Sequence, residues 1–241
     1  MELCITFLAG FSILVGALVV KLTDNKEIVE HISMAMALGA LIALLLFDLL
    51  PEIAEAGGNI GWIFIGLMIV LGIGILVGLD GFIPEHEELG EGEAKPNNAH
   101  IGLISALAIM VHNIVEGMTV YNMLSANLLH GLFFALGISL HNIPMGMMIY
   151  ATMIPHKRQE KVVLFGCITF STLLGGLIMY AVSGHLSDML IAGLLAIAFG
   201  MIIYIVVWEL LPHVARTKAM KENAIGFVLG FGVVFLSTLL G

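Results

Sequence analysis

Eight stretches of about 20 mostly apolar residues follow one another along the chain. A helix needs about 20 such residues to cross a bilayer. Hydrophobic residues make up 60% of the 241 residues and charged residues only 11%, which is too few to cover a soluble globule of this size. The sequence therefore predicts an all-α integral membrane protein, surrounded by lipid and forming a single domain over 1–241. The eight predicted spans are 2–22, 31–53, 60–79, 100–122, 128–152, 162–184, 189–211 and 224–240.

Other features of the sequence exclude several classes of protein. The first stretch has no basic segment and no small-residue cleavage site, so we interpret it as a membrane helix and not as a cleaved signal. The net charge is 9 − 18 = −9, which gives no basis for binding nucleic acid. Cys4 and Cys167 both lie in apolar stretches and do not form a metal-spaced pair.

The basic residues predict how the chain lies in the membrane. All nine Lys and Arg residues fall near connections on one predicted face, and the opposite connections have none. Because Lys and Arg gather on the cytoplasmic side, both termini are expected outside. The connection at about 80–99 is acidic and rich in Gly and Pro, and it is predicted to be a mobile cytoplasmic loop. The basic residues are Lys21, Lys26, Lys95, Lys157, Arg158, Lys161, Arg216, Lys218 and Lys221.

Two pairs of similar segments indicate an internal repeat. "HNIVEGM" at 112–118 matches "HNIPMGM" at 141–147, and "FDLLPEIA" at 47–54 matches "WELLPHVA" at 208–215. The members of each pair lie on spans that run in opposite directions. This arrangement predicts inverted-repeat symmetry, which is typical of secondary transporters that bind substrate near the middle of the bilayer. The alternative for the second pair is that "LLP" recurs by chance in a sequence rich in Leu.

The fourth and fifth predicted spans carry the candidate metal ligands. His112 and Glu116 are four residues apart and therefore share one helix face, and His141 and Met145 repeat that spacing. Ionisable groups within a span are costly and usually functional, and imidazole with carboxylate suits a divalent transition metal such as zinc. The alternative is that these groups only form hydrogen bonds that hold the helices together. The adjacent amides that could support the ion are those of Asn113 and Asn142.

Proline and glycine within these spans point to the same region. Pro144 leaves the carbonyl of Leu140 without its usual N–H partner, so this carbonyl could face an ion path. Gly117 and Gly146 are expected to let the fourth and fifth spans approach each other closely.

Two further pairs of polar residues lie toward the ends of spans. Asp48 and Glu52 near the outer end of the second span could guide ions in, and Glu209 and His213 near the inner end of the seventh could guide them out. The alternative is that these side chains simply reach water at helix ends. His31, at the inner start of the second span, could line an inner vestibule, but a solvated helix start is favoured.

With these motifs, "HNIVEG", "HNIPMG", "DLLPE" and "WELLP", and with eight spans, the chain resembles the ZIP (Zrt-, Irt-like) family of metal-ion transporters along essentially its whole length. It looks most similar to the small prokaryotic members, which implies a cell (inner) membrane. The resemblance implies uptake of a divalent cation, foremost zinc, into the cytoplasm by alternating access at a site between the fourth and fifth helices. It also implies a homodimer, no enzymatic activity and no resident cofactor. By motif position it implies a role in the metal path for His112, Asn113, Glu116, His141 and Asn142.

The chain departs from the family pattern at two places. Met145 stands where the family has a second glutamate, and "TFSTLLGG", with Ser171 and Thr172, stands where some members have a carboxylate in the sixth span. Both departures remove anionic ligands, which argues against a binuclear site. A single carboxylate would leave a divalent ion with a net charge of +1, and an uncompensated buried charge is costly.

These departures keep other hypotheses open. A thioether prefers softer metals such as Cu(I), so the selectivity of a ZIP-like transporter could be altered. A non-transporting metal sensor or scaffold is a second alternative. An intramembrane metalloenzyme is a remote third, because the zinc-protease signature HExxH is absent.

Overall fold

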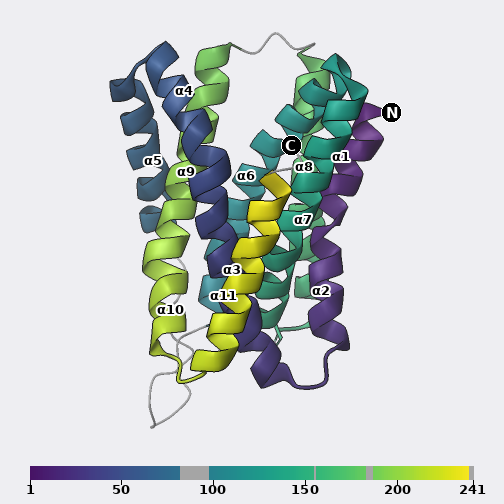
Figure 1. Cartoon of the computed structure of the whole chain (residues 1–241), viewed down its shortest axis with the longest axis vertical. Helices are drawn as coiled ribbons and strands as arrows, with labels where there is room; N and C mark the ends of the chain where they lie inside the picture. The colour runs from purple at the N-terminus through teal and green to yellow at the C-terminus, as the bar shows by residue number, and fades with distance from the viewer. Residues whose placement is uncertain (82–97, 155, 183–186, 239–241) are drawn as a thin grey trace.

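The structure of the chain is a computed structural model that describes residues 1–81, 98–154, 156–182 and 187–238. These residues fold into a bundle of helices that run along the long axis of the molecule (Figure 1). Among them, eight helical segments are long and apolar enough to cross a membrane. The prediction of an all-α membrane protein with eight spans is therefore confirmed.

The bounds of the spans differ from the predicted bounds mainly at the second and seventh. The fifth span, Leu128–Thr152, lies where it was predicted. The second continues to Ile60 and the seventh to Arg216, because amphipathic helices extend them beyond their most apolar stretches. In chain order the helices are α1 (Glu2–Phe11), α2 (Ile13–Leu22), α3 (Lys26–Leu44), η1 (Leu45–Leu49), α4 (Leu50–Ile60), α5 (Trp62–Asp80), α6 (Asn98–Ala126), α7 (Leu128–Thr152), α8 (Arg158–Ala181), α9 (Asp188–Tyr204), η2 (Ile205–Leu210), α10 (Leu211–Arg216) and α11 (Met220–Thr238).

The second and seventh spans each contain a π-helical turn at the same place in their shared motif. The turn η1 is followed by Leu50 and Pro51, and η2 by Leu211 and Pro212, so each proline lies in the first turn of the next α-helix. Proline is tolerated there because the first N–H groups of a helix have no intrahelical partner. Recurrence of "LLP" is thus matched by recurrence of a rare backbone form, which chance similarity would not produce.

Packing between the spans has the same two-fold relation. The pair formed by α3 and α11 corresponds to the pair formed by α9 and α5, and α6 against α8 corresponds to α7 against α2. The helices α6 and α7 lie together at the centre of this arrangement. The inverted repeat predicted from two short motifs therefore extends over the bundle.

Glycines allow the closest of these contacts. A Cβ at Gly117 would lie 1.9 Å from the carbonyl oxygen of Thr172, and one at Gly146 would lie 2.0 Å from that of Ile13. The expectation that these two glycines bring the fourth and fifth spans together is therefore wrong. They join the fourth span to the sixth and the fifth to the first.

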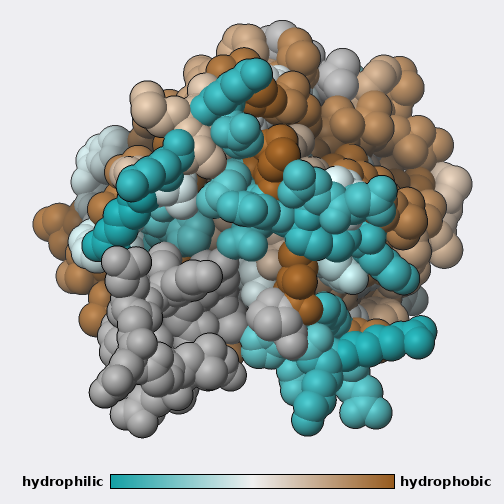
Figure 2. Space-filling view, turned by 90° about the horizontal axis from the view of Figure 1, so that it is seen from below, coloured by the Kyte–Doolittle hydropathy of each residue, from teal (hydrophilic) through white to brown (hydrophobic). Residues whose placement is uncertain are grey.

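One end of the bundle carries the basic connections. Hydrophilic side chains gather there in the view from below (Figure 2), where the α2–α3 and α10–α11 connections lie (Figure 1). Of the nine basic residues, Lys95 and most of the predicted loop at 80–99 lie outside the described residues. The other eight basic residues lie at or beside the connections of this end, which agrees with the predicted asymmetry. We call it the basic end.

Candidate functional site

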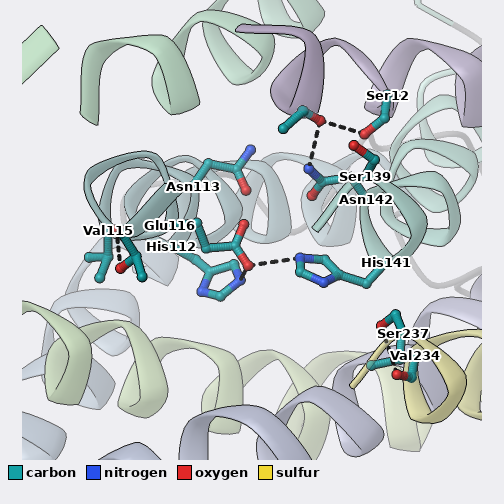
Figure 3. Close-up of polar contacts among 12 residues, drawn as sticks. Ser12, His112, Asn113, Val115, Glu116, Ser139, His141, Asn142, Val234 and Ser237 are labelled. Carbon is teal, nitrogen blue, oxygen red and sulfur yellow. Dashed lines mark hydrogen bonds and ion pairs between the residues drawn. The ribbon is translucent and has the colours of Figure 1, made fainter. Parts of the chain in front are cut away.

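Three buried side chains from two antiparallel helices meet at the centre of the bundle. Glu116 Oε1 lies 2.9 Å from Nε2 of His112, on the same helix α6, and 2.8 Å from Nε2 of His141 on α7 (Figure 3). The ligand atoms of the three lie within 4.8 Å of one another, and each residue is at most 6% exposed. The structure thus brings together the two histidines and the carboxylate that the sequence singled out.

A short turn places the two histidines at the same depth. The helix α6 ends at Ala126 and α7 begins at Leu128, with only Asn127 between them. The side chain of Asn127 accepts hydrogen bonds from the N–H groups of Leu129 and His130, which caps α7. His112 precedes Asn127 by 127 − 112 = 15 residues and His141 follows it by 141 − 127 = 14. At about 1.5 Å per residue, both histidines therefore lie roughly 21 Å from the turn.

Among the described residues, the polar atoms of this site contact only one another. Both ring nitrogens of His112, both carboxylate oxygens of Glu116 and Nε2 of His141 are buried, and the two His–Glu contacts are the polar contacts that they make among the described residues. Buried polar groups are normally satisfied, and leaving them unpaired is costly. Two imidazole nitrogens and a carboxylate oxygen are ligands that zinc and similar divalent cations accept. The residues present therefore fit a metal ion as a substrate.

Asn113 and Asn142 are held by backbone carbonyls of other spans. Nδ2 of Asn113 donates to the carbonyl of Ile168 at 3.4 Å, and Nδ2 of Asn142 donates to that of Ala9 at 3.3 Å. Both residues are fully buried, and Oδ1 of each has no partner.

Asp48 and Glu52 share a small cavity with the central site. The cavity has a volume of about 20 Å³, enough for about one water molecule. Asp48 is half-buried in η1 and Glu52 is exposed in the first turn of α4. The lining residues are Asp48, Leu49, Glu52, His112, Val115, Glu116, Thr119, Phe134 and Leu195. The sequence reasoning did not identify Thr119 and Phe134, because neither belongs to a repeated motif.

Glu209 and His213 lie on the other side of the centre, toward the basic end. Glu209 is half-buried in η2, and His213 is buried in α10 with Nδ1 lacking a hydrogen bond. His31 lies within electrostatic range of His213. It also lines a cavity of about 550 Å³ at the basic end, together with Glu27 and Glu222. The expectation of a solvated start of α3 at His31 is corrected in part, because its residue is half-buried and its Nδ1 is buried without a partner.

Met145 and Thr172 occupy fully buried positions. Met145 is one turn beyond His141 and packs in the hydrophobic core of the bundle. Thr172 lies against the first span, since a Cβ added at Gly10 would lie 2.7 Å from the Cβ of Thr172. The Oγ1 of Thr172 is buried without a hydrogen bond to the described residues. The symmetry relates Met145 to Glu116, so the two halves of the site differ at the position of the carboxylate.

Comparison with known proteins agrees with this arrangement. Residues 78–238 match the family described as ZIP zinc transporter. The chain is 27% identical over 248 residues to the zinc transporter ZupT of Enterobacter sp. (strain 638), covering 99% of this chain and 96% of that protein. It is also 27% identical over 244 residues to the zinc transporter ZupT of Salmonella newport (strain SL254), covering 98% and 95%. These relatives are named as transporters and not as enzymes. The family match, the eight spans and the buried His–Glu site together show that this multi-pass membrane protein belongs to the ZIP family of zinc transporters.

Proposed function

We propose that the protein carries a divalent transition-metal cation, foremost Zn²⁺, into the cytoplasm by alternating access at the site formed by His112, Glu116 and His141. The observation that carries this proposal is the convergence of three buried ligand groups from two antiparallel helices, with no other described residue bonded to their ligand atoms. Two neutral imidazoles add no charge, so the carboxylate offsets half of the charge of a divalent ion. Binding of this strength suits a carrier, which must release what it binds.

The small cavity supports entry past Asp48 and Glu52. A space of about 20 Å³ cannot hold a hydrated divalent ion, so the ion loses most of its water before it reaches Glu116. Asp48 lies within electrostatic range of all three central residues and can replace lost water with a carboxylate oxygen. Mg²⁺ gives up its water reluctantly, which favours zinc over magnesium on this path.

Release is proposed on the side of Glu209 and His213. The inverted repeat relates Asp48 to Glu209 and Glu52 to His213, so a path at one end has an equivalent path at the other. Buried imidazole nitrogens without partners on His213 and His31 offer ligands between the centre and the 550 Å³ cavity. Alternating access would use the two paths in turn.

The proposed orientation places the basic end in the cytoplasm and both termini outside, in a prokaryotic inner membrane. Single cysteines introduced at Lys26 and Asn127, in a chain lacking Cys4 and Cys167, test it. A membrane-impermeant maleimide added to intact cells should label the cysteine at 127 and not the one at 26. The reverse pattern would overturn the orientation. The homodimer implied by the resemblance stays a prediction.

Zinc flux into proteoliposomes tests the proposed function. Wild-type protein should accumulate zinc, and Glu116→Gln should lose it, because the only carboxylate of the central site becomes neutral. Glu55→Gln, which alters an exposed residue of α4 outside the cavity lining, is the matched control and should transport normally. Transport by Glu116→Gln would remove the proposed site, and zinc binding without flux by the wild type would indicate a sensor or scaffold.

Altered selectivity is a second candidate function, favoured by Met145 at the position related to Glu116. A flux panel of zinc, cadmium, iron, manganese and copper distinguishes the candidates. A thioether at the ion should favour the softer metals, and Met145→Glu should shift the preference toward zinc. An unchanged zinc affinity in Met145→Glu would show that this residue does not lie near the ion.

A further inference from the structure

Two buried serines form the same contact in the first and sixth spans. Ser12 Oγ donates to the carbonyl of Ala9 at 2.6 Å, and Ser171 Oγ donates to the carbonyl of Ile168 at 2.6 Å. Each serine thus bonds to the carbonyl three residues before it. A signal for this pair is present in the sequence as "FSILVG" at 11–16 and "FSTLLG" at 170–175. Neither serine belongs to the motifs that carry the proposed metal ligands.

The two carbonyls are also the acceptors for the amides of the central site. Ala9 accepts from Asn142 Nδ2 and Ile168 accepts from Asn113 Nδ2, so each carbonyl binds one serine and one asparagine (Figure 3 shows the pair on Ala9). The two sets are related by the inverted repeat and agree within 0.1 Å in their asparagine contacts, 3.3 and 3.4 Å. The same pair of contacts in both halves indicates a shared role.

This contact determines which end of each amide faces the ion. A carbonyl oxygen only accepts, so the amide nitrogen must point toward it and Oδ1 must point away. Oδ1 of both residues is buried without a partner, and the Oδ1 of Asn113 points toward Glu116 in Figure 3. A buried acceptor without a donor is costly unless a cation approaches it.

The hydroxyls affect the direction of the carbonyls. A serine that bonds back to a carbonyl of its own helix tilts that carbonyl and often bends the helix. At Ser12 the regular α-helix of the first span is interrupted by one residue, since α1 ends at Phe11 and α2 begins at Ile13. A tilt of this kind would turn the carbonyl toward the asparagine of the neighbouring span, which donates to it in both halves.

We propose that Ser12 and Ser171 are positioning residues, which orient the carbonyls of Ala9 and Ile168 so that Asn142 and Asn113 present their amide oxygens to the transported cation. This inference rests on the proposed function. It adds two spans, the first and the sixth, to the structure that sets metal affinity. Because an amide oxygen is a harder ligand than imidazole, the serines also contribute to the preference for zinc over cadmium.

Zinc and cadmium uptake in proteoliposomes tests the serines through kinetics. Ser12→Ala and Ser171→Ala should each raise the KM for zinc roughly two- to tenfold, the value of one hydrogen bond, with little change in maximal rate. The KM for cadmium should rise less. Ser12→Thr and Ser171→Thr retain the hydroxyl and should restore the zinc KM. If an alanine variant does not fold, the cysteine variant replaces the hydroxyl by a weaker donor of similar size.

The matched control is Ser237, which is buried and bonds back to the carbonyl of Val234 at 2.7 Å, and no asparagine of the described residues bonds to that carbonyl. Ser237→Ala should leave both KM values unchanged. An equal effect of Ser237→Ala, an unchanged zinc KM in both alanine variants, or failure of threonine to restore it would overturn the proposal.

A metal-free measurement separates this inference from the proposed function. The side-chain amide resonances of Asn142 and Asn113, assigned by substitution, should shift in Ser12→Ala and Ser171→Ala respectively, without any metal added. They should not shift in Ser237→Ala. If the wild type carries no zinc, the proposed function fails while this readout still decides whether the serines orient the amides. Unshifted resonances would overturn the positioning role even in a protein that transports zinc.

Discussion

The two halves of the inverted repeat share their packing but differ in their chemistry. In one half the carbonyl of Ile168 accepts hydrogen bonds from Asn113 and Ser171, and in the other the carbonyl of Ala9 accepts from Asn142 and Ser12, with nearly the same distances. The ligand positions do not match in this way. Glu116 is related to Met145, and Glu52 to His213. The comparison teaches that backbone contacts and small residues maintain the symmetry, while single side chains make the ion path asymmetric.

The largest effect is expected where the symmetric packing itself is broken. Gly117→Ala and Gly146→Ala would each place a Cβ at 1.9–2.0 Å from a carbonyl oxygen, so a helix must move. Each should lower the stability of the folded protein by about 3 kcal/mol, at the upper end for overpacking. Thermal unfolding in detergent measures this, with Gly166→Ala as control because a Cβ there meets nothing within 4 Å. Unequal losses in the two glycine variants would argue against equivalent halves.

Moving the carboxylate from position 116 to the symmetry-related position 145 tests whether both halves can supply a metal ligand. Glu116→Met should reduce zinc affinity by at least about 100-fold, which is the upper limit for losing a residue that only supports a ligand. Adding Met145→Glu in the same chain should recover much of the loss, because both positions follow a histidine by four residues. Equilibrium zinc binding to purified protein is the measurement. No recovery would mean that the second half cannot place a carboxylate at the ion.

A smaller effect is expected at the related acids of the two π turns. Asp48→Asn should raise the KM for uptake a few-fold and reduce its dependence on ionic strength, because capture from solution loses a charge. Glu209→Gln should instead lower the maximal rate and leave capture unchanged. Initial rates at low and high salt separate the two roles. Equal effects of both variants on KM would contradict assignment of entry to one turn and release to the other.

Local sequence patterns predicted most of the fold and the centre of the site. Apolar length was sufficient for eight spans, and the spacing of His112 and Glu116 predicted a shared helix face that the structure confirms. Hydropathy could not predict that the second span continues to Ile60 and the seventh to Arg216, since the residues beyond their most apolar stretches include polar and charged ones. The helices predicted to pack against Gly117 and Gly146 were wrong, because a small residue shows where another helix can approach but not which helix does so.

The supporting role of Ser12 and Ser171 was missed for a related reason. Ser12 and Ser171 act through a backbone carbonyl, and every residue type has one, so the sequence does not mark it. The asparagines that these carbonyls bind lie on other spans. The shared letters F-S-x-L-x-G were visible but pointed to no chemistry on their own. Thr119 and Phe134 reach the cavity only because α6 and α7 fold back at Asn127.

The π turns also have a consequence for how residues of the second and seventh spans can rotate about the helix axis. A π turn stores one extra residue inside a helix while the helices on either side keep their ordinary bonding. If the extra residue of η1 moved one position along the second span, the residue it passed would rotate by about 100° about the axis, the rotation that one residue makes in an α-helix. Deleting one residue from η1 would remove this extra residue and leave an ordinary α-helix. The side chain of Asp48 would then turn away from the cavity that it lines with Glu116.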